Sequence, residues 1–272
     1  LLGGVTSYLD MPNNNPSTCT MELLNAKKAI AAKDSVANYG FYLGANDDNL
    51  EEIKKGDTVM CGIVGFTGNN EAAPILLDGL SKLEYRGYDS AGIAVRNGDA
   101  EPEIVKAKGK LKVLKEMTND GKAVKGACGI GHTRWATHGE PSTVNAHPHC
   151  SDDENVIAVH NGIIENYQEL REKLIKKGYT FKSETDTEVA VKLIDYYYKK
   201  YLGTPVDALN HALVRIRGSY ALAVMFKDYP GEIYAARKDS PMIIGVTGGE
   251  SYLASDVPAI LKYTRNVYYI GN

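Results

Sequence analysis

The spacing of apolar residues changes repeatedly along the chain, and the changes predict a mixture of strands and helices. A short apolar run over residues 61–67 predicts a buried strand. The next segment, 71–84, predicts a helix, because four apolar side chains fall on one face: Ile75, Leu76, Leu80 and Leu83. Gly87 follows as a stop signal for this helix.

The pattern after residue 90 predicts two stacked sheets with helices outside them. Short apolar runs predict strands over residues 91–96, 103–107, 128–133 and 156–160. Helical patterns cover residues 166–177, 187–201 and 205–216. Gly178 follows the first of these helices, and Thr185 and Glu188 stand at capping-box spacing at the start of the second. Strands over 219–227, 232–237 and 242–246 are expected to be antiparallel, because their connections are too short for helical crossovers. This order favours a four-layer αββα sandwich of the α+β class.

The first 59 residues differ in pattern from the rest and are expected to form a separate segment. Residues 21–34 have helical composition, and residues 36–43 predict a strand. The stretch "GGVTSYLDMPNNNP" near the start has the Gly, Asn and Pro density of a strand that leads into a loop. We therefore expect two parts, residues 1–59 and residues 60–272.

Composition and charge exclude several classes of partner. With 43% hydrophobic residues, 24% charged residues and a formal charge of -3, the chain has no basic surplus for nucleic acid or an anionic membrane. No apolar run reaches the roughly 18 residues of a membrane span, so a cytoplasmic protein is expected. The four cysteines form no C-x-x-C pair, and we predict no metal site and no cofactor.

The stretch "GHTRWATHGEP", residues 131–141, predicts a loop that holds a polar ligand. It contains His132, Arg134, Trp135, Thr137 and His138 among glycines. The Arg134 guanidinium suits bidentate binding of a carboxylate. The alternative is structural, with Arg134 paired to an acid and Trp135 filling the core.

Two further stretches carry candidate residues. In "VHNGIIEN", residues 159–166, Asn161 and Gly162 are typical of a tight turn, but an Asn amide beside a Gly N–H also makes a two-donor pocket for an oxyanion. In "SETDTEV", residues 183–189, Asp186 starts a helix and suits the helix dipole; the other interpretation is a carboxylate for a substrate ammonium.

The motifs occur together, and their order is informative. "MCGIVGF" at 60–66 is followed by "LEYRGYDSAG", "HTRWATHGEP", "NAHPH", "HNGIIEN" and "SETDTE". Residues 60–272 thereby resemble the glutaminase domain of class II glutamine amidotransferases, and among them the glutamine:fructose-6-phosphate amidotransferases, or glucosamine-6-phosphate synthases. The resemblance implies an N-terminal-nucleophile hydrolase fold, which agrees with the layers inferred above.

The resemblance also implies a role for each candidate residue in the hydrolysis of L-glutamine to glutamate and ammonia. Cys61 would be the nucleophile and its own α-amino group the general base, with Asn161 and Gly162 as the oxyanion hole. Arg134 would bind the α-carboxylate of glutamine, and Asp186 its α-ammonium. The loop that closes over the substrate would carry three further residues: Trp135, Thr137 and His138. The family's sugar-phosphate isomerase half, which binds fructose 6-phosphate, has no counterpart in this sequence.

Residues 1–59 resemble a different family, the cyclic amidohydrolases of the dihydroorotase and allantoinase group. "GGVTSYLDMPNNNP" carries this resemblance, and Asn13 would match the residue that holds the substrate carboxylate. No histidine precedes His132, so the family's metal-binding motif is missing and a zinc hydrolase could not activate water. We expect this dihydroorotase-like fragment to add no activity.

The position of Cys61 leaves two interpretations open. In the chain as written, its nitrogen is joined to Met60, so an inactive glutamine-binding fold is the alternative to an active glutaminase. Translation from Met60, or cleavage after it, would give Cys61 a free amino group. The last residues, "VYYIGN", predict a strand, and we expect the glutaminase domain to be truncated at its C-terminal edge.

Overall fold

The computed structural model describes residues 7–10, 38–41, 61–135 and 139–271. The chain divides into two units, Leu1–Thr58 and Val59–Asn272. In the first unit, β1 (Ser7–Asp10) and β2 (Asn38–Phe41) form a parallel pair. The strand predicted over 36–43 is therefore confirmed in β2, whereas the helix predicted over 21–34 lies outside the described residues.

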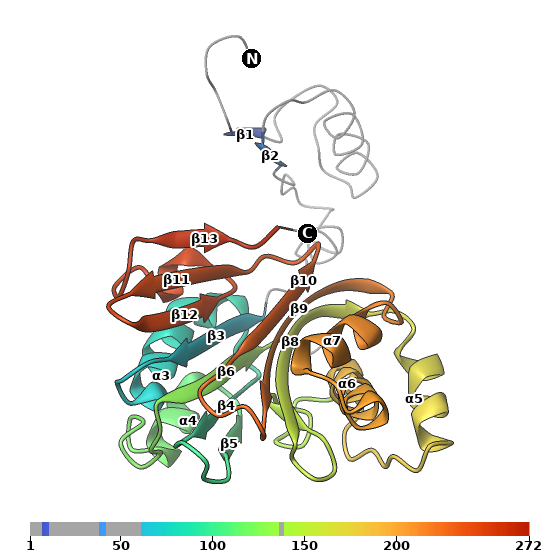
Figure 1. The fold of residues 1–272 in the computed structure, drawn as a ribbon. Coiled ribbons are helices and arrows are strands. Elements are labelled where there is room, and N and C mark those ends of the chain that lie inside the picture. The colour runs from blue at the N-terminus through green and yellow to red at the C-terminus, as the bar shows by residue number, and fades with distance from the viewer. Residues whose placement is uncertain (1–6, 11–37, 42–60, 136–138, 272) are drawn as a thin grey trace. The chain divides into compact units, whose positions relative to one another are not determined.

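The described strands of the second unit form two sheets in which all neighbours are antiparallel (Figure 1). The seven-stranded sheet has the order β13-β11-β12-β3-β6-β4-β5, with β3 (Gly62–Thr67), β4 (Ser90–Arg96), β5 (Glu103–Lys108), β6 (Cys128–Arg134), β11 (Ile243–Thr247), β12 (Glu250–Ala254) and β13 (Val267–Tyr269). The four-stranded sheet has the order β10-β9-β8-β7, with β7 (His149–Cys150), β8 (Val156–Ile164), β9 (Gly218–Phe226) and β10 (Tyr234–Lys238).

Helices cover the outer face of each sheet, which confirms the predicted four layers (Figure 1). The seven-stranded sheet is covered by α3 (Ala72–Leu83), α4 (Leu111–Met117) and two short 3-10 turns, η1 (Glu84–Arg86) and η2 (Val257–Ala259). The four-stranded sheet is covered by α5 (Tyr167–Ile175), α6 (Asp186–Tyr201) and α7 (Pro205–Leu213). The fold is an α+β sandwich of four αββα layers.

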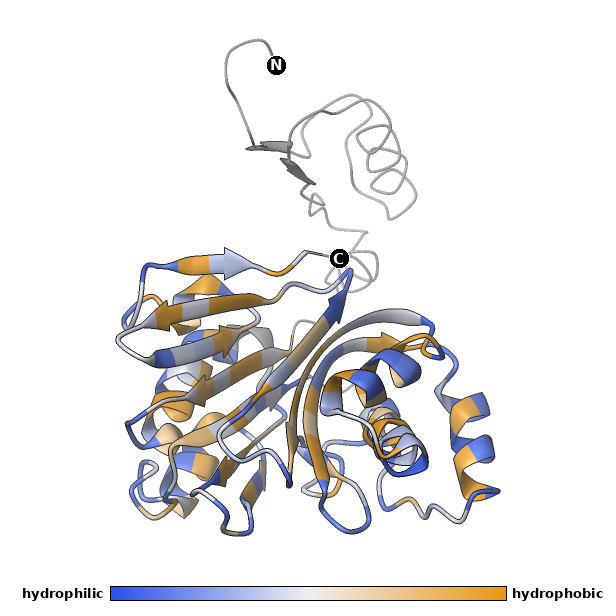
Figure 2. Ribbon diagram, in the orientation of Figure 1, coloured by the Kyte–Doolittle hydropathy of each residue, from blue (hydrophilic) through white to orange (hydrophobic). Residues whose placement is uncertain are grey.

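The alternation of side chains along each strand explains why the sheets stack. In β9, Leu222 and Val224 belong to the core beneath the helices, whereas Ala221 and Ala223 belong to the core between the sheets. Successive residues of a strand point to opposite faces, so a strand that is apolar on both faces must be covered on both. Figure 2 shows hydrophobic residues along the strands and alternating hydrophobic and hydrophilic residues along α5, α6 and α7.

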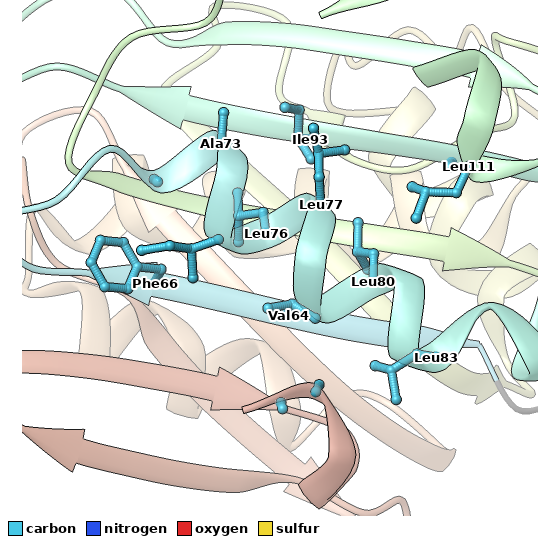
Figure 3. Packing of buried hydrophobic residues seen from close by; sticks show 14 of the residues in the cluster. Val64, Phe66, Ala73, Leu76, Leu77, Leu80, Leu83, Ile93 and Leu111 are labelled. Carbon is cyan, nitrogen blue, oxygen red and sulfur yellow. The ribbon is translucent and has the colours of Figure 1, made fainter. Parts of the chain in front are cut away.

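The helix predicted over 71–84 is α3, and its apolar face packs as expected. Leu76 and Leu80 are fully buried against β3 and β4. Figure 3 shows these side chains beside Val64 and Phe66 of β3 and Ile93 of β4. This packing fixes β3, the strand that follows Cys61.

Two motifs extend further into strands than their residue types suggest. The strand predicted over 128–133 is confirmed as β6, which continues to Arg134, so the first residues of the "GHTRWATHGEP" stretch lie in a strand and not in the predicted loop. The tight-turn interpretation of Asn161 and Gly162 is wrong, because β8 continues to Ile164 and pairs with β9 at both positions. Pairing with neighbouring strands outweighs the local preferences of these polar residues and glycines.

Three other details differ from the sequence-based expectations. The strand predicted over 242–246 is β11, and it joins the seven-stranded sheet rather than pairing with β10. Thr185 caps α6 by accepting from the Glu188 backbone N–H, but the Glu188 carboxylate accepts from the backbone of Lys182 and Ser183, so the capping box is incomplete. The structure also contains α4 and β12, which the pattern did not predict.

Candidate active site

Cys61 lies immediately before β3 and beside the end of β6. Because β3 and β6 are antiparallel neighbours, with Gly62 opposite Thr133, the start of one strand meets the end of the other. The backbone N–H of Trp135 donates to Cys61 Sγ at 3.3 Å, and the thiol donates to the Trp135 carbonyl at 3.6 Å. The sheet register therefore places the thiol against the residue that follows Arg134.

The Cys61 thiol is buried, and burial raises its pKa to about 11. Removing the thiolate from water is unfavourable, and the hydrogen bond from Trp135 only partly offsets this cost. The group is therefore a neutral thiol at pH 7. Cys61 needs a base that removes its proton before it can act as a nucleophile.

Asn161 and Gly162 lie in β8 of the four-stranded sheet, and both are near Cys61. The Asn161 side chain donates from Nδ2 to the Cys61 carbonyl oxygen at 2.8 Å. Gly162 has φ +113, and a Cβ atom there would lie 2.2 Å from the Ser219 carbonyl oxygen. Only glycine fits this backbone position, so the register of β8 on β9 depends on it.

His132 determines which way the Asn161 amide points. Its Nε2 lies 3.0 Å from the His160 carbonyl oxygen and 3.1 Å from Asn161 Oδ1. Both partners are acceptors, so the network assigns the proton to Nε2. Burial lowers the pKa of His132 to about 3, which keeps the ring neutral. With Oδ1 engaged by His132, the Nδ2 donor of Asn161 is directed toward Cys61.

Arg134 and Asp186 are both buried, and each is held by backbone groups. Arg134 ends β6 and donates from Nη2 to the Gly139 carbonyl at 3.0 Å, with Nη1 at 3.9 Å from Asp89 Oδ1. Asp186 opens α6, and its Oδ2 accepts from the Ile164 backbone N–H at 2.9 Å. A cation and an anion are thus fixed on different elements by local hydrogen bonds.

Most of the described candidate residues line one cavity. Its lining consists of Cys61, Arg134, Trp135, His147, His160, Gly162, Thr185, Asp186 and Thr187. Asn161 contacts this group through the Cys61 carbonyl. Thr137 and His138 lie outside the described residues. The structure therefore brings together a thiol, paired N–H donors and two opposite charges from segments far apart in sequence.

The "LEYRGYDSAG" motif supports this site, although the sequence assigned no role to its residues. A Cβ atom on Gly87 would lie 2.7 Å from the Arg134 carbonyl carbon, so glycine allows the backbones to approach closely. Tyr88 makes an edge-to-face contact with Trp135, with ring centroids 5.1 Å apart. In the sequence, a glycine between tyrosines just after a predicted helix could have indicated this supporting role.

The buried histidines beside the site should make the domain sensitive to acid. Burial lowers the pKa values of His132, His147 and His149 below the ordinary value. The unfolded chain binds these protons below about pH 6.5 and the folded chain does not, so stability is full above that pH and falls below it. Each histidine contributes a slope of up to about 1.4 kcal/mol per pH unit. Chemical denaturation at pH 7.5, 6 and 5 should show this loss.

A His149→Gln variant should lose stability less steeply with acid than the native chain, because one titrating group is removed. Equal free energies of unfolding at pH 7.5 and pH 5 would contradict the account of the buried histidines.

Comparison with known proteins identifies the class. Residues 132–262 match the model of the glutamine amidotransferase domain family. The structure is similar to the glutamine phosphoribosylpyrophosphate amidotransferase from B. subtilis complexed with ADP and GMP. The TM-score is 0.65 and the identity 28%, over 77% of this chain and 44% of that one. The chain therefore contains a glutamine amidotransferase domain, and its fold is that of the N-terminal-nucleophile hydrolases.

The named relatives indicate which amidotransferases this chain is similar to. Over 214 residues, or 78% of this chain, it is 58% identical to the glutamine--fructose-6-phosphate aminotransferase [isomerizing] of Caldanaerobacter subterraneus. It is 54% identical to that of Clostridium acetobutylicum and 52% identical to that of Thermus thermophilus, each over 78% of this chain. Over this share of its length the chain is similar to a part of these aminotransferases. It spans about a third of each of these relatives, 34% of their length.

The described residues show neither a helix suited to cross a membrane nor a group of side chains arranged for a metal ion. No described helix combines the length and apolar character needed to cross a membrane. Within the same residues, no group of three or more His, Cys, Asp or Glu side chains is arranged to hold a metal ion.

Proposed function

We propose that residues 61–272 hydrolyse L-glutamine to glutamate and ammonia, with Cys61 as the nucleophile. The observation that carries this proposal is the cavity that holds the Cys61 thiol together with Arg134, Gly162 and Asp186. A cavity lined by a thiol and by two opposite charges suits an amino acid with a side-chain carboxamide.

The reaction passes through one covalent intermediate, with two proton transfers during its formation and two more during its hydrolysis. Cys61 Sγ attacks the carboxamide carbon while its proton passes to the base, which is the α-amino group of Cys61 when that group is free. The oxyanion that forms accepts hydrogen bonds from Asn161 Nδ2 and the Gly162 N–H. Return of the proton to nitrogen releases ammonia and leaves a γ-glutamyl thioester. Water then attacks the thioester, giving glutamate and the thiol.

The other residues bind and orient the substrate. Arg134 takes the α-carboxylate, and Asp186 takes the α-ammonium, so the carboxamide is directed to Cys61. Trp135 supplies a half-exposed ring and a backbone N–H that already contacts Sγ. Thr137 and His138, which follow Trp135 in the sequence, are assigned to glutamine binding as well.

The names of the relatives point to a use for the ammonia. We infer that the ammonia serves amination of fructose 6-phosphate by a sugar-phosphate isomerase domain, so that the two together form glucosamine 6-phosphate. A cytoplasmic location fits this role. The domain assignment is part of the same proposal: residues 60–272 carry the glutaminase, and residues 1–59 are a dihydroorotase-like fragment without activity.

A second candidate function is a glutamine-binding fold without turnover. The observation that favours it is the position of Cys61, whose nitrogen is an amide in the chain as written and has no lone pair for a proton. Binding through Arg134 and Asp186 does not depend on that nitrogen. The two functions therefore differ in glutamate release and agree in glutamine binding.

The test is release of glutamate from glutamine by a chain that begins at Cys61, with asparagine as a substrate control. Cys61→Ala in this chain should abolish turnover and leave glutamine binding measurable by calorimetry. Cys128→Ala is the matched control, because Cys128 is buried between the sheets, and it should retain activity. Glutamate release that survives Cys61→Ala would refute the proposal.

A further inference from the structure

A second cavity lies where the edge strands of the two sheets meet, on the other side of His149 from the catalytic cavity. It has a volume of about 230 Å³ and is lined by residues of β5, β7, α6 and the segments around them. A small metabolite fits this space.

The charges in this cavity do not balance. Lys106, Lys182 and Lys192 line it together with the carboxylates of Asp152 and Glu188. Both carboxylates are engaged by Lys192, at 3.0 Å from Asp152 and 2.9 Å from Glu188. Among the described carboxylates, none forms an ion pair with Lys106 or Lys182. With three ammonium groups and two carboxylates, the lining carries one net positive charge, which favours an anionic ligand.

The acidic partners of Lys192 are held in place by further hydrogen bonds, and Glu188 also stabilises the charged form of Lys106. Glu188 also accepts from the backbone N–H groups of Lys182 and Ser183 and from the Ser183 hydroxyl. Asp152 also accepts from the Thr180 hydroxyl. The internal ion pairs are thus fixed by hydrogen bonds to the scaffold, and the excess positive charge is a property of the folded site.

Of the two lysines, Lys106 should be stabilised more than Lys182 by a bound anion. Its ammonium donates to the Val144 carbonyl at 3.1 Å, which uses one of its three donor hydrogens. Burial lowers the pKa of Lys106 to about 8, so the charged form lacks part of the solvation it would have in water. An anionic oxygen placed beside Nζ would restore that interaction.

Part of the cavity lining is apolar. Ile104, Val144 and Pro148 supply carbon surface beside the lysines. A ligand that matches both parts of the lining has an anionic head and a short carbon body. Lys106 and Lys182 can each bind an oxygen of a phosphate monoester, whose charge is about −1.5 to −2 at pH 7.

We propose that this cavity binds a small phosphate monoester, with its phosphate on Lys106 and Lys182 and its carbon body against Ile104, Val144 and Pro148. The site goes beyond glutamine hydrolysis and uses none of the residues assigned to it. It also has a structural connection to the catalytic cavity, because His149 lines it and lies 3.0 Å from Thr185 Oγ1, the cap of the helix that carries Asp186.

Calorimetric titration of the full 272-residue chain with glycerol 3-phosphate tests the proposal. We expect saturable binding that weakens with added salt, as screening requires. Lys106→Met and Lys182→Met should each weaken binding by about tenfold or more, the loss of one charge-assisted contact. Lys106→Arg keeps the charge and should bind. Lys112→Met is the control, because Lys112 is 84% exposed on α4, and it should bind like the native chain.

Three outcomes would overturn the proposal. The first is no saturable binding of glycerol 3-phosphate below roughly 10 mM. The second is native binding by Lys182→Met; this exposed position tolerates substitution, so the result stands even if Lys106→Met fails to fold. The third is equal affinity for inorganic phosphate and glycerol 3-phosphate, because the apolar part of the lining would then contribute nothing.

Discussion

A chain that begins at Cys61 should release glutamate from glutamine, whereas the unprocessed 272-residue chain should be nearly inactive. The reason is the proton on the thiol. Burial raises the pKa of Cys61 to about 11, so only about one thiol in ten thousand is ionised at pH 7. A free α-amino group has an ordinary pKa near 8 and can accept the proton, but an amide nitrogen cannot.

The size of the expected effect follows from the role of the base. A positioned general base contributes a factor of about 10² to 10⁴ in rate. The 272-residue chain should therefore turn over glutamine slower by about this factor, while Arg134 and Asp186 remain in place. Its kcat should fall, and its affinity for glutamine should change much less.

Three samples measure this difference: the full chain, the chain that begins at Cys61, and the latter with Cys61→Ala. Intact mass must be recorded for each, because removal of the first residues during expression would activate the full chain. Activity is expected in the second sample alone. An unprocessed full chain as active as the chain beginning at Cys61 would show that the amino-terminal base is not required.

The layers of the fold could be predicted because they depend on local periodicity. The face of α3 and the alternation in β9 require only apolar residues at spacings of about 3.6 and 2. The assignment of β11 to a sheet could not be obtained in this way. Its antiparallel direction follows from short connections, but its neighbours β12 and β13 are set by contacts along the whole sheet.

The candidate site was predictable in its residues and not in its geometry. The motifs identify Cys61, Arg134, Asn161 and Asp186, and all four gather at one place in the structure. The contact of Cys61 with the Trp135 backbone depends on the register of β3 on β6, which no local pattern encodes. The bond from His132 to Asn161 joins strands of different sheets, so it requires the stacking of the sandwich.

Asn161→Ala in the chain that begins at Cys61 should lower kcat by about 10²–10³, or about 2.7–4 kcal/mol of transition-state stabilisation. The amide has two hydrogens on Nδ2, and one of them is used by the Cys61 carbonyl in the structure. The other can donate to the oxyanion. That oxyanion exists only after attack by the thiol, so KM for glutamine should change little.

Asn161→Asp separates loss of the donor from loss of structure. Aspartate keeps an oxygen that accepts from His132 Nε2, but it has no hydrogen for the oxyanion and adds a negative charge beside it. Its kcat should therefore fall at least as far as that of Asn161→Ala. Asn70→Ala is the matched control, because Asn70 lies beyond the other end of β3, is exposed, and should leave kcat unchanged. If Asn161→Asp retains native kcat, the amide is not an oxyanion donor, and its bond to the Cys61 carbonyl is structural.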